Sequence, residues 1–129
     1  MIERIQPEGL RRPPTYTPVV RATGGSTIYI SGQVSADVDG NIVGIGDFEA
    51  QARQVFSNLR LALASVGADF SNVVKITTFI ANYTPDLRDV YGAARAQATG
   101  DSLPASTLIG VQALAMPEYL IEIEAIAVV

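Results

Sequence analysis

The chain has 129 residues, 48% of them hydrophobic, and its nine basic and thirteen acidic side chains give a formal net charge of −4. It contains no His and no Cys, which excludes Ser-His and Cys-His nucleophilic pairs, disulfides and zinc sites built from imidazole or thiolate. The acidic balance argues against a nucleic-acid partner, because phosphate binding needs clustered Lys and Arg. We expect one domain over residues 1–129, cytoplasmic and without a membrane partner, because no leader or long apolar run is present. The Asp spacing is not that of a calcium loop, so we predict no metal.

The first quarter of the chain is predicted to be extended and then to form strands. Four prolines interrupt residues 1–18, which should therefore run over the surface without helix. Two short strands are predicted over 19–22 and 27–34, around a turn at Gly24-Gly25.

Two helices are predicted from their capping residues and their apolar periodicity. The first begins at Asp47, a good N-cap residue, and ends before Gly67. The second begins at Thr84, with Pro85 in its first turn, and ends before Gly100. Each helix has an apolar stripe that should be buried. The stripes consist of Phe48, Ala52, Val55, Phe56, Leu59, Leu63 and Val66 in the first helix, and of Leu87, Val90, Tyr91, Ala94 and Ala98 in the second.

The second half of the chain supplies three more predicted strands. They cover residues 73–81, a segment near 107–111, and the closing segment 119–129. The closing strand is apolar on both faces, which predicts burial on both, yet Glu122 and Glu124 point to the same side of it. Carboxylates are seldom buried without partners, so this strand is a candidate for chemistry. The order of elements predicts an α+β fold with two helices on one face of a mixed sheet.

Six segments carry a resemblance to one protein family. They are Tyr16 after a proline pair, Tyr29-Ile-Ser-Gly-Gln33, Glu49-Ala-Gln-Ala-Arg-Gln-Val-Phe-Ser-Asn-Leu59, Val73-Val-Lys-Ile-Thr-Thr-Phe79, Leu103-Pro-Ala105 and Ile121-Glu-Ile-Glu-Ala-Ile-Ala-Val128. Together they resemble the RidA family, also called YjgF/YER057c/UK114 or endoribonuclease L-PSP, over nearly the whole chain. The resemblance implies a chorismate-mutase-like fold, a homotrimer with small-molecule ligands in clefts between subunits, and no cofactor.

The same resemblance implies a hydrolase that converts reactive enamines and imines, such as 2-aminoacrylate, into 2-oxo acids and ammonia. It assigns the positioning of the attacking water to Glu122. It places Tyr16, Ser31 and Gly32 in the lining of the substrate pocket. We add Phe79, at the end of a segment expected to form a wall of the cleft, as either a ligand contact or a core residue.

Ser106 stands where the family holds the substrate carboxylate with an arginine. A hydrogen bond to a charged group contributes about 1.5–3 kcal/mol, so its loss predicts an altered substrate choice and disfavours 2-aminoacrylate. In one interpretation the site hydrolyses an imine without a carboxylate there, and Ser106 or Thr107 binds a neutral oxygen. In another, the trimer only binds small molecules or partners. Rescue by Arg11, Arg12 or Arg88 from a neighbouring subunit stays open, and endoribonuclease activity is the weakest interpretation because the chain is acidic and lacks His.

Overall fold

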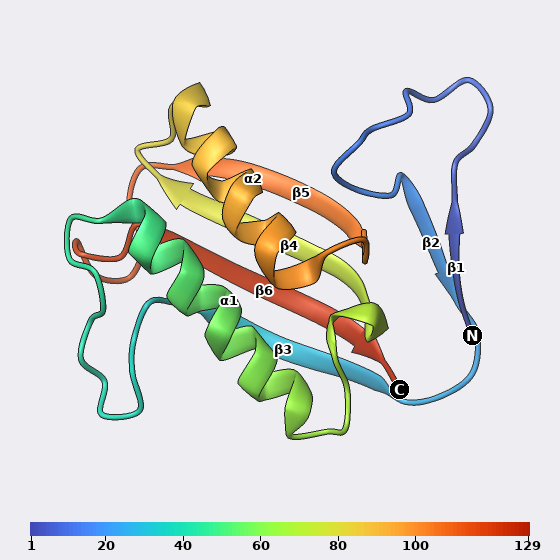
Figure 1. Ribbon diagram of the computed structural model, residues 1–129, viewed down its shortest axis with the longest axis horizontal. Helices are drawn as coiled ribbons and strands as arrows, with labels where there is room; N and C mark the ends of the chain where they lie inside the picture. Colours follow the sequence, from blue (N-terminus) through green and yellow to red (C-terminus); the bar gives the residue numbers. More distant parts are fainter.

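The computed structural model describes residues 1–129 and places two helices on one face of a four-stranded sheet, with a separate two-stranded arm (Figure 1). This confirms the predicted α+β class and the mixed sheet with both helices on one face. The arm consists of β1 (Ile2–Ile5), β2 (Val19–Ala22) and the segment 6–18 that joins them. The sheet consists of β3 (Thr27–Gln33), β4 (Val73–Ala81), β5 (Ala105–Val111) and β6 (Ile121–Val128). The helices are α1 (Phe48–Ala64) and α2 (Pro85–Thr99), and a short 3-10 turn, Phe70–Asn72, leads into β4.

The order of strands in the sheet is β3-β6-β4-β5. The two central strands β6 and β4 are antiparallel, and β6 is also antiparallel to β3. β5 is parallel to β4, because α2 carries the chain back across the sheet between them. β5 and β3 are therefore the two edge strands.

The helix ends follow the local signals in the sequence. The Asp47 carboxylate accepts a hydrogen bond from the backbone N–H of Ala50 at 3.1 Å, which caps α1. After α1 the chain turns at Gly67, where φ is +72°, and the N–H of Ala68 bonds back to the carbonyl of Leu63 at 3.0 Å. Pro85 is the first residue of α2, as predicted. Neither helix has the length and apolarity that crossing a membrane requires.

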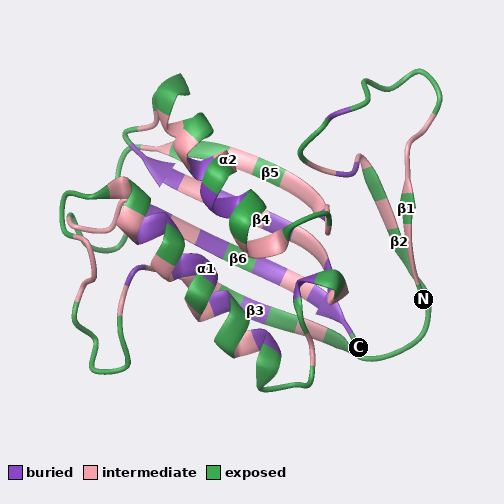
Figure 2. Ribbon diagram, viewed as in Figure 1, coloured by how far each residue is buried: buried purple, intermediate pink, exposed green.

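The core lies between the helices and the sheet face beneath them (Figure 2). Alternate residues of β6, among them Ile121 and Ile123, are fully buried on this side. The intervening residues face away from the helices, where Glu122 is half-buried and Glu124 is exposed. The closing strand was predicted to be buried on both faces. Within one chain its helix side is buried throughout, and on the opposite side only Val128 is buried. We call the opposite side of the sheet the helix-free face.

Gln51 fixes the segment that leads into β6. It lies in α1 with no exposed surface, although its neighbours in the stripe are apolar. Its amide nitrogen donates to the carbonyls of Gly44 at 3.1 Å and Glu118 at 2.9 Å, and its amide oxygen accepts from the N–H of Leu120 at 2.9 Å. These bonds tie α1 to the start of the strand that carries Glu122.

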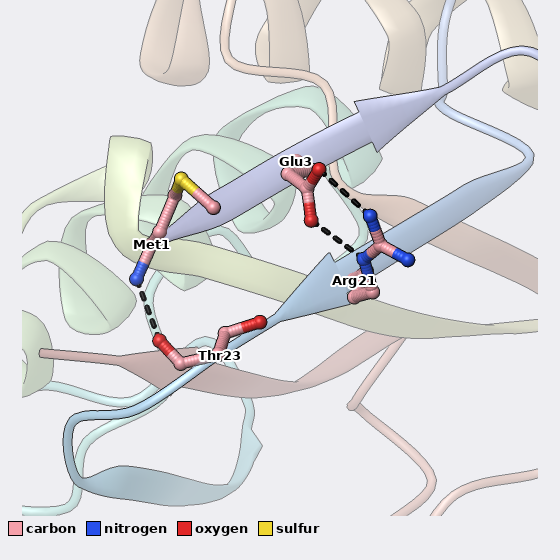
Figure 3. Close-up of polar contacts among 4 residues, drawn as sticks. All are labelled: Met1, Glu3, Arg21 and Thr23. Carbon is pink, nitrogen blue, oxygen red and sulfur yellow. Dashed lines mark hydrogen bonds and ion pairs between the residues drawn. The ribbon is translucent and has the colours of Figure 1, made fainter.

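The two strands predicted around the turn at Gly24-Gly25 are present as β2 and β3, but they do not pair with each other. β2 pairs with β1, in a segment expected only to be extended, and β3 pairs with β6. Gly24 and Gly25 have φ of +73° and +74° and redirect the chain from the arm into the sheet. A bidentate ion pair from Arg21 to Glu3, at 2.6 and 2.9 Å, joins the two strands of the arm (Figure 3).

Candidate functional site

Glu122 lies on the helix-free face, directly above Gly32. A Cβ atom added to Gly32 would stand 1.9 Å from Oε2 of Glu122, so this carboxylate fits only because residue 32 has no side chain. The register of β3 against β6 shifts between Ile30 and Gln33, a bulge that includes Gly32. Glu122 forms no ion pair and no side-chain hydrogen bond. Its oxygens are therefore free to accept hydrogen bonds from water or a ligand.

Three other predicted residues share the helix-free face. Phe79 is the direct neighbour of Glu122 on β4 and forms an apolar wall beside the carboxylate. Ser31 is exposed on β3, next to Gly32. The hydroxyl of Thr107 accepts a hydrogen bond from the ammonium of Lys75 at 2.6 Å. Partial burial lowers the pKa of Lys75, and the nearby negative charge of Glu124 opposes that shift.

A cavity of about 510 Å³ lies on the other side of the sheet, between the arm, α2 and the start of β5. Tyr16 of the arm and Ser106 of β5 both line it, so the structure brings these two predicted residues together. Ser106 pairs with Ile76, a residue buried under the helices, which places the serine on the helix side. The arm is attached to the start of β5 by a bond from the N–H of Thr17 to the carbonyl of Pro104 at 3.1 Å.

Three arginines line the same cavity: Arg11, Arg88 and Arg95. Arg11 and Arg88 are two of the three arginines considered above as replacements for the family arginine, and the third, Arg12, does not line this cavity. Arg95 was not among the residues predicted for the site. The spacing of residues in α2 could have identified it. Arg95 lies four residues after Tyr91 and seven residues after Arg88, so all three side chains lie along one side of the helix.

Arg95 is only 8% exposed. Its one side-chain hydrogen bond is a long one, 3.4 Å from Nη1 to the hydroxyl of Thr99. Burial raises the pKa of the neighbouring Tyr91. The hydrogen bond between the Tyr91 and Thr78 hydroxyls and the positive charge of Arg95 both act to lower that pKa. The two ion pairs of the chain, Arg21 with Glu3 and Arg53 with Glu49, involve none of the cavity arginines.

The residues predicted to form one pocket thus form two groups in a single chain. Ser106 lies level with Ile76 of β4 on the helix side, whereas Glu122 lies level with Phe79 on the helix-free face. The two residues are offset by three residues along the strand direction and by two strand spacings across the sheet. Their Cα atoms are therefore about 14 Å apart. A site that uses both Ser106 and Glu122 therefore needs a second copy of the chain.

Comparisons with known proteins cover both groups of residues. The family model described as endoribonuclease L-PSP matches residues 10–129. A 2-iminobutanoate/2-iminopropanoate deaminase of Mus musculus is 40% identical over 102 residues, which is 79% of this chain and 73% of that protein. The 3-aminoacrylate deaminase RutC of Acinetobacter baylyi is 32% identical over 128 residues, 97% of this chain and 96% of that one. The crystal structure of YyfB, a Rid-family protein of unknown function from Yersinia pestis, superposes with a TM-score of 0.93 at 37% identity, covering 99% of this chain and 98% of that one.

Proposed function

Because the chain belongs to the endoribonuclease L-PSP family, also called the RidA family, we propose that it hydrolyses a reactive imine or enamine to a carbonyl compound and ammonia. The names of the deaminase relatives support this reaction class. The structural observation that carries it is Glu122, a half-buried carboxylate without a partner that lies over Gly32. Such a group can hold a water molecule and accept its proton.

The proposed reaction proceeds by addition of water to a C=N bond. Glu122 accepts a proton from water as the water oxygen bonds to the imine carbon, and the electron pair of the C=N bond moves to nitrogen. Glu122 then returns the proton to nitrogen, which gives a carbinolamine. Glu122 next takes the proton of the new hydroxyl and passes it to the nitrogen, so that the C–N bond breaks and ammonia leaves as the carbonyl forms. An enamine first gains a proton on carbon and loses one from nitrogen to become the imine. Phe79 limits the access of bulk water on one side of the carboxylate, and the Ser31 hydroxyl is available to orient the substrate.

The proposed assembly is a homotrimer with its clefts between copies. The helix-free face exposes Tyr29 (77%) and Ile109 (38%) near its two edges, and apolar surface of this kind is typical of an interface between subunits. Contact between the helix-free face of one copy and the cavity of the next would join the two groups of residues. Sedimentation equilibrium measures this directly, and a monomer at micromolar concentration would contradict it.

We also propose that the substrate choice differs from that of family members with an arginine at this position, because Ser106 is much smaller than arginine. Its hydroxymethyl group leaves open the part of the cavity that an arginine side chain would fill. Ser106→Arg should therefore shift the preference toward short 2-imino acids and away from bulkier ones. A variant with the same relative rates as the wild type would show that this position does not select the substrate.

The test of the reaction class compares Glu122→Gln with Glu124→Gln. Both variants remove one negative charge from the same strand, and only the first removes the proposed base. With imines generated in situ and ammonia release as the measure, Glu122→Gln should lose at least about 100-fold in turnover, whereas Glu124→Gln stays near the wild type. Equal rates in all three proteins would contradict the role of Glu122. If the wild type accelerated the hydrolysis of no imine, the reaction class would be refuted, and the alternative of a trimer that only binds small molecules would remain.

A further inference from the structure

We propose that the cavity between the arm, α2 and β5 is an anion-binding site, in which Arg88 and Arg95 hold a carboxylate and Arg11 faces it from the arm. The assignment of that carboxylate to the imine substrate rests on the proposed function. The binding of the anion does not depend on it.

The burial of Arg95 is the first observation behind this site. A guanidinium carries five N–H donors and a permanent charge, and removing it from water is costly unless an anion compensates. Arg95 is more than nine-tenths buried, lines the cavity, and has one long hydrogen bond to a hydroxyl and no carboxylate partner. The charge of Arg95 is therefore without a counter-ion within the chain.

The local excess of positive charge is the second observation. The chain carries a net charge of −4, yet three of its eight arginines line one cavity, where Asp89 is the only acidic side chain. Arg88 and Arg95 are seven residues apart on α2, two turns along the same side of the helix. Two guanidiniums on one wall can hold both oxygens of a carboxylate through charge-assisted hydrogen bonds.

The position of Ser106 indicates which class of ligand the cavity binds. Ser106 lies across the cavity from α2, so a carboxylate held by Arg88 and Arg95 lies farther from β5 than one held by an arginine at position 106. The hydroxyls of Tyr16 and Ser106 lie in the same cavity and can bond to the polar groups next to the carboxylate. The geometry selects acids, and it opposes the sequence-based interpretation in which the ligand is uncharged.

The experiment measures binding without turnover. Calorimetry compares 2-oxobutanoate, a stable carboxylate of the product class, with its uncharged methyl ester. We expect the wild type to prefer the acid, Arg88→Gln and Arg95→Gln each to weaken its binding about tenfold or more, and added salt to weaken it further. Arg12→Gln is the matched control, because Arg12 is an exposed arm residue beside Arg11 that does not line the cavity.

Folding of the variants is followed by thermal unfolding. Arg88 is exposed, so its replacement should not disturb the fold, and Arg95→Lys keeps the buried charge but loses the planar fork. Equal affinity for acid and ester, or an Arg12→Gln loss as large as that of Arg88→Gln, would overturn the site. So would a finding that Arg88→Gln and Arg95→Gln dissociate the oligomer and leave the affinity for acid unchanged, because the arginines would then pair with a neighbouring copy.

The two proposals fail separately. Glu122→Gln should abolish hydrolysis and still bind 2-oxobutanoate. Acid binding that depends on Arg88 and Arg95, without hydrolysis of any imine, would refute the proposed function and leave the anion site standing. Imine hydrolysis by a wild-type protein that binds the acid no better than the ester would refute the anion site and leave the proposed function standing.

Discussion

Replacing Gly32 with alanine would place a methyl group where the Glu122 carboxylate now lies. The new Cβ would be 1.9 Å from Oε2, 2.7 Å from Cδ and 3.0 Å from Cγ of Glu122. To reach ordinary van der Waals separation the carboxylate oxygen must move by about 1.5 Å. Gly32 does not have a positive φ, so alanine fits the backbone and the conflict lies only with this side chain.

The change should separate activity from stability. Glu122 is half-buried and can rotate, so the free energy of unfolding should fall by no more than about 1 kcal/mol, the strain of a side chain outside its preferred rotamer. A catalytic group displaced by more than 1 Å loses about 100-fold in rate. We therefore expect Gly32→Ala to unfold at nearly the wild-type urea midpoint and to release ammonia from imines about 100 times more slowly.

A double-mutant cycle identifies the cause of the loss. In a Glu122→Ala background the methyl group meets no carboxylate, so Gly32→Ala should then change neither the rate nor the stability further. Wild-type turnover in Gly32→Ala would refute the reasoning, because it would show that hydrolysis tolerates a displaced Glu122. A full additional loss in the Glu122→Ala background would show that Gly32 acts through some other group.

Two further predictions concern the packing that supports the site. Gln51→Leu should lower the free energy of unfolding by about 3 kcal/mol, since it leaves three backbone groups without their partners, and an unchanged urea midpoint would contradict this. Burial raises the pKa of Tyr91 above 10.0, so the folded chain retains a proton that the unfolded chain loses, and stability falls as the pH rises above that value. Tyr91→Phe should remove this alkaline loss, measured as the change in urea midpoint between neutral pH and about pH 11, and an undiminished loss would count against it.

The features that the sequence predicted well depend on local interactions. Asp47, Gly67 and Pro85 determine helix ends through their own backbone geometry and caps, and each end could be located from neighbouring residues alone. The pairing of β2 with β1 was not predictable in this way, because it depends on partners between 14 and 20 residues away along the chain.

Polar residues inside apolar stripes were the other source of error. Gln51 and Arg95 both lie on buried sides of helices, but a search for hydrophobic periodicity counts a polar side chain as outward-facing. Their burial becomes clear only from distant partners: the backbone around Glu118 for Gln51 and the wall of a cavity for Arg95. The resemblance likewise indicated candidate residues but not their faces, since the register of β5 against β4 decides on which side Ser106 lies.

The four-stranded sheet also acts as a partition between opposite charges. Glu122 lies on one side of the sheet and Arg95 on the other, so within one molecule the two side chains cannot form an ion pair with each other. In the proposed trimer the acid and the guanidiniums would first meet across a subunit boundary. A newly synthesised chain that has not yet found its companions would therefore be latent, with both halves of a hydrolytic centre folded and charged but unable to cooperate.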